Sequence, residues 1–398
     1  MLKKQRILFI ATGYGDSPVL SGGEVRLFNI VKHLSGKILP DFLTTSGGVS
    51  AADNYRISGF FRNIVTVKNR FMGIKESSGF QRLIGYYISA FDAEKKLTAV
   101  KYDAIYTSSD CYGDIYPAYK YRLNNQSAKW FCMLHHKYDS PFKRPGFFPV
   151  NALLYLLQLH SYKMIAKRAD CVFVLETEAG EQIAQTLIKY GYKGQIHYVK
   201  NGINKIPAVK TKKDKSMAVY LGGLRPSKGL YDIVPVWKKA WEKNPKLKLT
   251  VIGKGSDKDM KYLKDTVEKN GLSGSVTIAG YVDTKNLNTL LSKAYVFFLP
   301  SREEGWGISI LEALQHGCLP VVYDLPAFKV FKNNVVRIPR FDHGVYAEEM
   351  LKAFKSKSNG VNKKFIAKFY WSDIAKNELS IIKMMVGRSD GRKVGGKI

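Results

Sequence analysis

Two carboxylates and two glycines stand close together in the run EGWGISILEALQHG. Glu304 and Glu312 lie seven residues apart, Gly305 and Gly307 lie between them, and the apolar run YVFFLPS at 295–301 comes just before. This order predicts a strand, a glycine-bearing loop and an amphipathic helix. A helix N-terminus presents free N–H groups and the positive end of the helix dipole, which favour phosphate. With a carboxylate at each end to bind hydroxyls, the segment suits a diphosphate that joins two hydroxyl-rich rings.

A second loop supplies positive charge. In YLGGLRPSKGLYD, an apolar strand is followed by Gly222 and Gly223, then by Arg225 and Lys228, and then by a helix-type run. Two cations beside a helix N-terminus are suited to oppose a diphosphate. A solvated basic turn is the plainer interpretation, and the nearby loop of Glu304 argues against it.

The first half of the chain opens with a similar device. The strand-type run RILFIA leads to Gly22 and Gly23, which precede an amphipathic helix. Such bare backbone can approach a phosphate or a sugar closely, although any strand-to-helix turn can carry glycines. Farther on, MLHHKYD ends a strand in His135 and His136. Strand ends of a parallel sheet face the ligand crevice, so either histidine could donate to a substrate hydroxyl or carbonyl; a merely polar strand end is the alternative.

The triplet DKD at 257–259 has the pattern of a site for a metal-bound nucleotide, but it follows VIGKGS at a predicted helix start. There Ser256 would cap the helix and the aspartates would be its first-turn acids. Because Arg225 and Lys228 could offset a diphosphate, the sequence predicts a site without a metal ion.

Strand-type and helix-type runs alternate along the whole chain, which implies parallel sheets covered on both faces. The polar run KIPAVKTKKDKS separates two such sets, so the expected class is α/β with two doubly wound, Rossmann-like domains. Ligands of such sheets bind beyond the carboxyl ends of the strands, and we expect the site in the cleft between the domains. The expected strands span 6–11, 104–109, 129–134, 171–176, 195–201, 217–222, 247–253, 275–282, 295–300 and 318–324. The expected parts are an N-terminal domain at 1–204, a linker at 205–216, a C-terminal domain at 217–370, a helix at 371–387 that returns to the first domain, and a basic tail at 388–398.

The chain has 398 residues, with 63 basic and 33 acidic residues and a net charge of +30. Nucleic acid, an anionic membrane face or an acidic substrate would all suit this surface, as would a simply basic, solvated one. No recognition helix, zinc finger or RNA-binding motif supports nucleic acid. No segment is long and apolar enough to span a bilayer, and the short apolar run after Lys3 and Lys4 fits a first strand better than a signal peptide, so we expect a cytoplasmic chain. The four cysteines, Cys111, Cys132, Cys171 and Cys318, have no metal-type spacing and read as reduced core residues.

One helix-type segment offers two interpretations. In SGFQRLIGYYISAF, apolar residues recur at helical spacing, which favours an ordinary core-facing helix. The preceding run FFRNIVTVKNRFMGIK at 60–75 mixes Phe and Met with Arg and Lys. That mixture suits a membrane-interface patch, and a basic loop over the core explains it equally well. The apolar positions of the helix are Phe80, Leu83, Ile84, Tyr87, Ile88 and Phe91.

Taken together, these motifs resemble retaining, nucleotide-sugar-dependent glycosyltransferases of the GT-B fold, family 4 (glycosyl transferases group 1). The resemblance runs nearly end to end and is strongest from residue 198 to 324. The family's loop of Glu, Gly, aromatic, Gly and a second Glu reads here as Glu304, Gly305, Trp306, Gly307 and Glu312. Its closing turn reads Asn201-Gly202-Ile203, and its N-terminal pair of glycines reads Gly22-Gly23.

The resemblance implies a role for each matching residue. Glu312 would hold the ribose hydroxyls, Glu304 would contact the transferred sugar, and His135 would touch that sugar near the reacting carbon. Arg225 and Lys228 would neutralise the leaving diphosphate. The residues implied to bind the donor are Gly22, Gly23, Gly253, Tyr281, Val282, Gly305, Trp306, Gly307, Ile308, Ser309 and Glu312.

The resemblance further implies a UDP- or GDP-sugar as donor and no cofactor. The basic charge and the region 60–91 favour peripheral association with the cytoplasmic face of an anionic membrane and a glycan or lipid-linked acceptor. The role would lie in cell-surface glycan or glycolipid synthesis. Two departures matter. The family usually has Arg where this chain has Gly223, so Arg225 would have to substitute, and next to His135 the family often has Asp where this chain has His136. A non-catalytic GT-B scaffold and a GT-B sugar-nucleotide epimerase are the alternatives.

Overall fold

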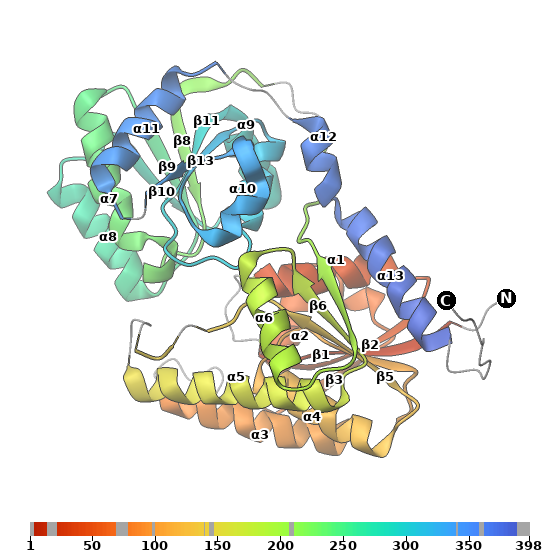
Figure 1. Ribbon diagram of the computed structural model, residues 1–398. Helices are drawn as coiled ribbons and strands as arrows, with labels where there is room; N and C mark the ends of the chain where they lie inside the picture. Colours follow the sequence, from red (N-terminus) through yellow and green to blue (C-terminus); the bar gives the residue numbers. More distant parts are fainter. Residues whose placement is uncertain are drawn as a thin grey trace. The chain divides into compact units, whose positions relative to one another are not determined.

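The computed structural model describes residues 4–13, 22–68, 79–97, 100–138, 140–142, 147–206, 211–339, 341–357 and 362–387, with only the backbone of 79–83 and 86. The chain forms two compact units (Figure 1). The first comprises Met1–Asn201 together with Trp371–Ile398, and the second comprises Gly202–Tyr370. The basic tail expected at 388–398 lies outside the described residues.

The first unit is built on a seven-stranded parallel sheet in the order β3-β2-β1-β4-β5-β6-β7. The order reverses between β1 and β4, so their carboxyl ends form a topological switch point, where ligands of such sheets bind. Its strands are β1 (Arg6–Ala11), β2 (Leu39–Thr45), β3 (Asn63–Val67), β4 (Ala104–Thr107), β5 (Lys129–Leu134), β6 (Cys171–Leu175) and β7 (Gln195–Val199). Its helices are α1 (Gly22–Leu34), α2 (Ser46–Asn54), α3 (Gly79–Leu97), α4 (Tyr112–Asn124), α5 (Phe148–Arg168), α6 (Glu178–Lys189) and α13 (Trp371–Gly387).

The second unit repeats the plan with six parallel strands in the order β10-β9-β8-β11-β12-β13, and its switch point lies between β8 and β11. The two parallel sheets with helical crossovers confirm the expected doubly wound fold. Its strands are β8 (Asp214–Leu221), β9 (Lys248–Ile252), β10 (Val276–Gly280), β11 (Ala294–Leu299), β12 (Leu319–Tyr323) and β13 (Val336–Ile338). Its helices are α7 (Leu230–Lys243), α8 (Asp257–Lys269), α9 (Thr284–Lys293), α10 (Ile308–Gln315), α11 (His343–Lys355) and α12 (Lys363–Ile366). Since β8 begins at Asp214, the end of the segment expected to be linker is strand.

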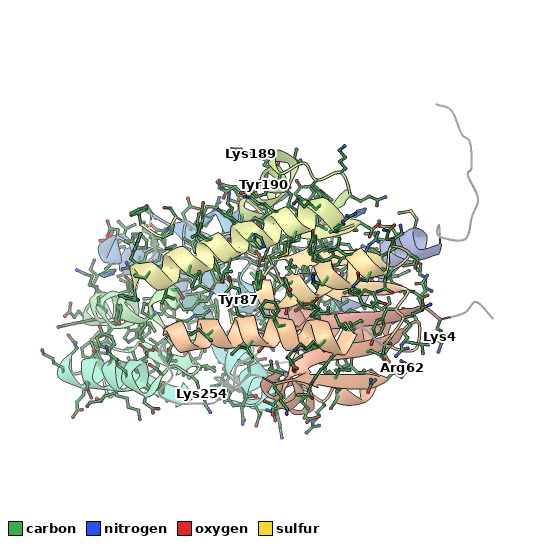
Figure 2. The ribbon with its side chains drawn as sticks, turned by 90° about the horizontal axis from the view of Figure 1, so that it is seen from below. Lys4, Arg62, Tyr87, Lys189, Tyr190 and Lys254 are labelled. Atoms are coloured by element: carbon green, nitrogen blue, oxygen red, sulfur yellow. The ribbon has the colours of Figure 1, made fainter. Side chains whose placement is uncertain are left out.

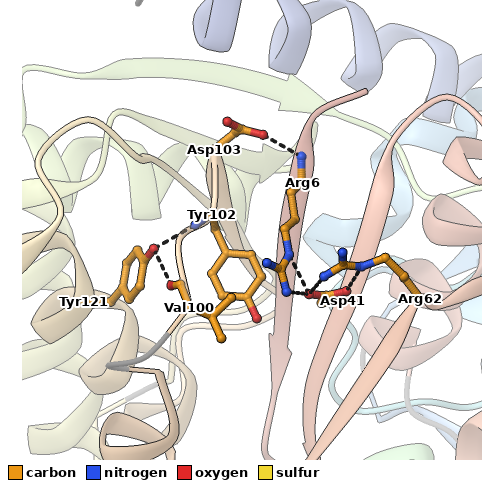
Figure 3. Close-up of polar contacts among 7 residues, drawn as sticks. All are labelled: Arg6, Asp41, Arg62, Val100, Tyr102, Asp103 and Tyr121. Atoms are coloured by element: carbon orange, nitrogen blue, oxygen red, sulfur yellow. Dashed lines mark hydrogen bonds and ion pairs between the residues drawn. The ribbon is translucent and has the colours of Figure 1, made fainter. Parts of the chain in front are cut away.

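Three strands were not expected from the sequence, namely β2, β3 and β13. β2 carries the buried carboxylate of Asp41, which interrupts its apolar pattern. Arg6 of β1 and Arg62 before β3 both bind this carboxylate, each with a contact of 2.8 Å (Figure 3). Burial alone would raise the pKa of Asp41, but the hydrogen bonds from Arg62 and Arg6 lower it below its ordinary value. The ion cluster therefore ties three neighbouring strands together.

The same contacts bear on the segment 60–75, for which a membrane-interface patch was one interpretation. Phe61 is buried and stacks on Phe42 with ring centroids 4.5 Å apart, and Arg62 is held by Asp41. Residues 63–67 form a strand of the sheet. The part of the segment described by the structure is thus built into the first unit, and Phe71 and Met72 lie outside the described residues.

The expectation that α3 turns its large apolar residues to the core is wrong. Ile84, Ile88 and Phe91 are exposed by 38%, 38% and 46%. Helix α3 buries small residues instead, among them Ser89 and Ala90, because it packs closely along α4. Phe80 and Leu83 lie outside the described side chains. Cys111 is likewise exposed, whereas the other three cysteines are buried as expected.

Helix α13 packs against α1 in the first unit. The guanidinium of Arg26 forms a buried ion pair with Glu378 of α13 and lies over the ring of Trp371 at 5.9 Å. Tyr106 donates to the other oxygen of the same carboxylate at 3.1 Å. A buried charge without a partner is costly, so this pairing fixes α13 in its place. Among the described residues, no helix is long and apolar enough to cross a membrane.

Candidate active site

Two loops of the second unit meet at its switch point. Residues 222–229 follow β8, and residues 300–307 follow the neighbouring strand β11. The backbone N–H groups of Arg302 and Glu303 both donate to the carbonyl of Ser227 at 3.0 Å. The loop predicted to supply cations (residues 222–229, the cation loop) and the loop predicted to supply carboxylates (residues 300–307, the carboxylate loop) are therefore hydrogen-bonded to each other.

Glycines make this close approach possible. Gly229 has a φ of 75°, and a Cβ there would lie 1.9 Å from the carbonyl oxygen of Pro300. Gly253, at the end of β9, has a φ of 144°, and a Cβ there would lie 1.9 Å from the carbonyl oxygen of Gly222. No other residue fits either position without displacing backbone. Gly253, predicted to line the base pocket, thus also shapes the cation loop.

The predicted charged residues come together here. The ammonium of Lys228 lies 2.6 Å from the carboxylate of Glu304 and 3.3 Å from the carbonyl of Glu303. Ser301 donates to the other oxygen of Glu304 at 3.0 Å. Lys228 and Glu304 are largely buried, which fixes their positions and strengthens their attraction.

Arg225 lies beside the position where the family usually has its arginine. A Cβ at Gly223 would be 3.9 Å from the Nε atom of Arg225. The hydroxyl of Tyr220, buried on β8, lies 3.2 Å from the carbonyl of Gly223 and 3.1 Å from that of Lys228. Tyr220 thereby holds both ends of the cation loop, a role that sequence reasoning did not assign.

Helix α10 begins at the end of the carboxylate loop. Gly307 caps it with a φ of 95°, and a Cβ there would lie 2.9 Å from the ring of Phe328. The N–H groups of Ile308 and Ser309, the first two helical residues, have no acceptor within an α-helix and can bind an anion. Trp306 is buried edge-on to Phe331, so its side chain supports the loop from the core. Gly305 joins this indole to Glu304.

Glu312 lies on the second turn of α10. Burial raises the pKa of its carboxyl to about 7, and no hydrogen-bond partner accompanies it among the described residues. A desolvated carboxylate without donors is stabilised by hydroxyl groups that a ligand brings. This environment suits the predicted role of binding ribose hydroxyls.

Asp232 holds the carboxylate loop in place through Arg302. It is fully buried on α7 and accepts two hydrogen bonds from Arg302, at 2.7 and 2.8 Å, and one from His343 at 2.6 Å. Burial would raise the pKa of Asp232, but Arg302 and His343 lower it. Sequence reasoning missed this group because its members lie 70 and 111 residues apart. The sequence did contain one signal for it, because Asp232 is an isolated acidic residue within an apolar, helix-type run.

The predicted base pocket lies at the ends of β9 and β10. The N–H of Gly253 donates to the carbonyl of Gly280 at 2.8 Å, which places Tyr281 and Val282 next to that glycine. The ring of Tyr281 is 62% exposed, and the ammonium of Lys254 lies 5.7 Å from its centroid. An exposed aromatic ring beside a cation offers a stacking face for a planar base.

In the first unit, the predicted glycine pair and the predicted histidine come together. A Cβ at Gly23 would lie 3.1 Å from Nε2 of His135, while Gly22 opens helix α1. That Nε2 is 3.0 Å from the carbonyl of Ser108, so it carries the proton and donates. Burial, with a smaller effect of Arg26, lowers the pKa of His135 to about 4. The neutral ring then offers Nδ1 as an acceptor rather than a second donor.

His136 points to other partners. Its ring lies 6.1 Å from that of Tyr138, and its carbonyl accepts from the amide of Gln158 at 2.9 Å. His135, rather than His136, is therefore the histidine that meets the glycine pair.

Two buried carboxyls in the segment that follows β4 were also missed. Asp114 accepts from the backbone N–H of Thr12 at 2.7 Å and from Ser109 at 2.6 Å, and burial raises its pKa to about 6. Asp110 accepts from Gln158 and Tyr162, and burial raises its pKa as well. Both belong to the polar run SSDCYGD that follows β4 at the switch point, and this placement was the signal.

The triplet at 257–259 opens helix α8. Ser256 accepts from the N–H of Asp259 at 3.2 Å as the N-cap, and Asp257 lies in the first turn. The described residues contain no cluster of three or more His, Cys, Asp or Glu side chains suited to a metal ion. The helix-cap interpretation of this triplet is confirmed.

Comparison with known proteins adds independent findings. Residues 203–367 match the model of the family described as "Glycosyl transferases group 1". The GDP-mannose:cellobiosyl-diphosphopolyprenol alpha-mannosyltransferase of Xanthomonas oryzae is 28% identical over 110 residues, which cover 28% of this chain and 29% of that protein. The O-antigen chain mannosyltransferase RfbU of Salmonella typhimurium is 28% identical over 185 residues, 46% of this chain and 51% of that one. The chain thus spans about half or less of the length of these curated relatives.

Solved structures resemble the whole chain. The sucrose-phosphate synthase of Thermosynechococcus elongatus has a TM-score of 0.74 at 17% identity, covering 97% of this chain and 100% of that one. Anabaena HepE, solved in complex with UDP and glucose, has a TM-score of 0.69 at 14% identity, covering 95% of this chain and 99% of that one. At these identities the likeness shows the fold, with both parallel sheets included.

Proposed function

We propose that the protein moves a sugar from a nucleotide-diphosphate sugar to an acceptor hydroxyl, because residues 203–367 match the model of the group 1 glycosyl transferases and the chain has the GT-B fold. The observation that carries this proposal is the joined pair of loops at the switch point between β8 and β11. There Lys228, Arg225 and the start of α10 provide positive charge, and Glu304 and Glu312 provide acceptors for hydroxyls. A diphosphate linking two sugar rings requires these groups.

The site residues fall into two groups, those that would bind the charged diphosphate and those that would bind the uncharged sugar rings and base. Lys228, Arg225 and the N–H groups of Ile308 and Ser309 neutralise the diphosphate as it leaves. Glu312 binds the ribose hydroxyls, and Tyr281 stacks on the base. Glu304 and His135 accept from hydroxyls of the transferred sugar.

The reaction we propose retains the configuration at the anomeric carbon. As the bond to the diphosphate breaks, negative charge grows on the leaving oxygen and the sugar becomes oxocarbenium-like. The acceptor hydroxyl attacks from the same face and passes its proton to the departing phosphate oxygen. The protein then needs no nucleophile, and its fixed cations lower the barrier by stabilising the leaving group. With two cations in place, turnover proceeds without a metal ion, so a chelator should leave the rate unchanged.

We propose a glycan or lipid-linked acceptor at the cytoplasmic face of a membrane. The two mannosyltransferases named above support this, since one is named for a diphosphopolyprenol-linked acceptor and the other for the O-antigen chain. UDP and GDP are the donor nucleotides that the relatives suggest, because HepE was solved with UDP and the Xanthomonas enzyme is named for GDP-mannose.

A thermal-shift screen against UDP, GDP, ADP and their sugars tests the proposal, with Glu312→Ala as the paired variant. A ligand present at about 100 times its dissociation constant stabilises the folded protein by roughly 2.7 kcal/mol. We expect a shift with one nucleotide and its loss in the variant. If no nucleotide shifts the protein, the non-catalytic scaffold is favoured. If a donor is consumed equally with and without acceptor extracts, and its epimer appears, the epimerase is favoured.

The Gly223 departure has its own test. Arg225→Ala should reduce turnover strongly, and adding Gly223→Arg to that variant should restore part of it, because the new side chain starts 3.9 Å from the lost Nε. The same rescue should fail in Lys228→Ala, whose lost charge lies elsewhere. Unchanged turnover in Arg225→Ala would show that this arginine does not replace the family's.

A further inference from the structure

We propose that the outer face of α3 and α5 docks on an anionic lipid bilayer. Its biological sense rests on the proposed function, since a lipid-linked acceptor would lie in that bilayer, but the binding itself can be tested without any acceptor. The surface, called here the α3–α5 face, overlaps the region 60–91 suggested by the sequence only in α3, and α5 adds the larger part of it.

The first half of α5 is turned with its polar side inward. Asn151, Gln158 and Ser161 are buried, and the amide of Gln158 donates to Asp110 at 2.7 Å. Leu156, on the outer side, is 60% exposed. Three more leucines of this half are only partly buried, namely Leu153, Leu154 and Leu157. A surface helix of a protein surrounded by water normally has the reverse arrangement.

Exposed aromatic rings extend this surface at the start of α5. Phe147 and Phe148 are 72% and 46% exposed, and Phe142 is 84% exposed. The rings of Phe142 and Phe148 lie 5.0 Å apart, so they form a cluster rather than scattered single residues. Contiguous exposed apolar groups of this kind mark a surface that is covered in use.

Helix α3 contributes a second apolar stripe. Ile84, Ile88 and Phe91 stand at i, i+4 and i+7 and are all exposed. This is the spacing at which an amphipathic helix presents one apolar face, here outward rather than to the core.

Aromatic contacts join the two helices across α4. Tyr87 of α3 lies 4.8 Å from Tyr112 of α4, whose ring lies 6.0 Å from His160 of α5. Phe91 contacts Tyr116 one turn farther along α4, at 5.0 Å. In Figure 2, Tyr87 lies between the ribbons of α3 and α5, and α4 packs against both of these helices. The exposed groups of α3 and α5 therefore belong to one continuous face.

The charge on this face selects an anionic occupant. Helix α5 has no acidic residue in its 21 positions. Its exposed cations are Lys163, Lys167 and Arg168. The acids of α3 are compensated, because Asp92 lies 3.5 Å from Lys96 and Glu94 lies 3.6 Å from Lys120.

A second copy of this chain would carry its own net charge of +30, so like-charge repulsion between the two chains opposes a dimer. Anionic lipid headgroups attract it instead, while the exposed rings and aliphatic groups enter the interface. Lys and Arg can keep their charged ends at the headgroups as their stems lie along apolar surface.

Flotation with phosphatidylcholine vesicles, with and without phosphatidylglycerol, tests the proposal on the full chain. The wild-type protein should float with the anionic vesicles and stay in solution with the neutral ones. The double variant Leu156→Glu/Ile88→Glu should bind at least about tenfold more weakly, because two exposed apolar groups that would enter the bilayer become charged. The matched control is Ile188→Glu, which is 59% exposed on α6, a helix that contributes none of the apolar groups of this face, and it should bind like the wild type.

Charge reversal at Lys163 and Lys167 gives a second, independent variant that leaves the apolar groups in place. It should remove the dependence on phosphatidylglycerol, and circular dichroism should show an unchanged fold. Equal flotation of wild type and both variants would overturn the proposal, as would a dimer in sedimentation that the Leu156→Glu/Ile88→Glu change dissociates. Nucleotide-induced thermal shifts should be the same in all these proteins, so a failure to bind donor would count against the proposed function and not against this face.

Discussion

The carboxyl edges of the two sheets carry loops of similar build and different charge. In the second unit, the switch point between β8 and β11 holds the ion pair of Lys228 and Glu304, with Arg225 beside it. In the first unit, a neutral His135 at the end of β5 donates to the carbonyl of Ser108, which follows β4 at the switch point. Burial raises the pKa of the two carboxyls of the segment after β4, Asp110 and Asp114.

The difference predicts that the two units bind different parts of the substrates. Fixed opposite charges in a partly buried loop favour a ligand whose charge grows during reaction. A neutral imidazole carries no positive charge to oppose a diphosphate, so the site around His135 favours an uncharged, hydroxyl-rich ligand. The second unit would thus recognise the nucleotide diphosphate, and the first would orient the sugar or its acceptor.

The strongest test of this difference between the two units is to remove the charged side chains of the second unit. Lys228→Ala and Glu304→Ala should each reduce turnover of a nucleotide sugar about 100- to 1000-fold, since losing one preorganised group of this kind typically costs roughly 2.7–4 kcal/mol. Lys261→Ala is the control, because its ammonium pairs with Asp265 on the exposed side of α8. Wild-type turnover in a folded Glu304→Ala protein would remove the carboxylate loop from the active site.

Lowering the pH should weaken nucleotide binding by the second unit selectively. Burial places the pKa of Glu312 at about 7 without ligand, and hydroxyl donors favour its ionised form. Nucleotide affinity should therefore be full above pH 7 and fall by up to about tenfold per pH unit below it. The stability of the free protein should move the other way, with this carboxyl's destabilising effect growing as the pH rises from 4.5 to about 7.

Titration calorimetry across this range, with Glu312→Gln as the comparison, checks the prediction. The variant should bind more weakly at neutral pH and show a flatter profile. The comparison is needed because burial also places the pKa of Asp114 at about 6, in the first unit. A profile that stays steep in Glu312→Gln would assign the dependence to another group.

A single methyl group should disturb the first unit alone. In Gly23→Ala the new Cβ would lie 3.1 Å from Nε2 of His135, so the ring must shift and its bond to Ser108 weakens. We expect turnover to fall about tenfold, the cost of roughly one hydrogen bond, with nucleotide affinity unchanged. Gly59→Ala, with nothing within 4 Å of the new methyl, is the matched control. Loss of nucleotide binding in Gly23→Ala would show that the two units do not divide the ligand in this way.

Local sequence patterns predicted the fold class and the two loops, because both depend on residues that are close together in the chain. Strands such as β5 and β11 are continuous apolar runs, and the glycines of the second unit stand where backbone must approach backbone. The orientation of α3 was not predictable in this way, since it depends on how small residues fit against α4. The support of Arg302 by Asp232 also escaped, because partners 70 residues apart meet only after folding.

The smallest expected effect concerns how firmly the cation loop is held. The hydroxyl of Tyr220 reaches the carbonyls of Gly223 and Lys228, and nothing else on this ring is polar. Tyr220→Phe should lower the free energy of unfolding by about 0.5–1.5 kcal/mol, the usual net value of one hydrogen bond. It should also raise the KM for the donor more than it lowers kcat, because Lys228 keeps its charge but loses part of its fixed position. Urea denaturation and steady-state kinetics measure both, with Tyr262→Phe on α8 as the control. An unchanged KM together with reduced stability would mean that Tyr220 braces the fold without positioning the charge on which the contrast between the two units depends.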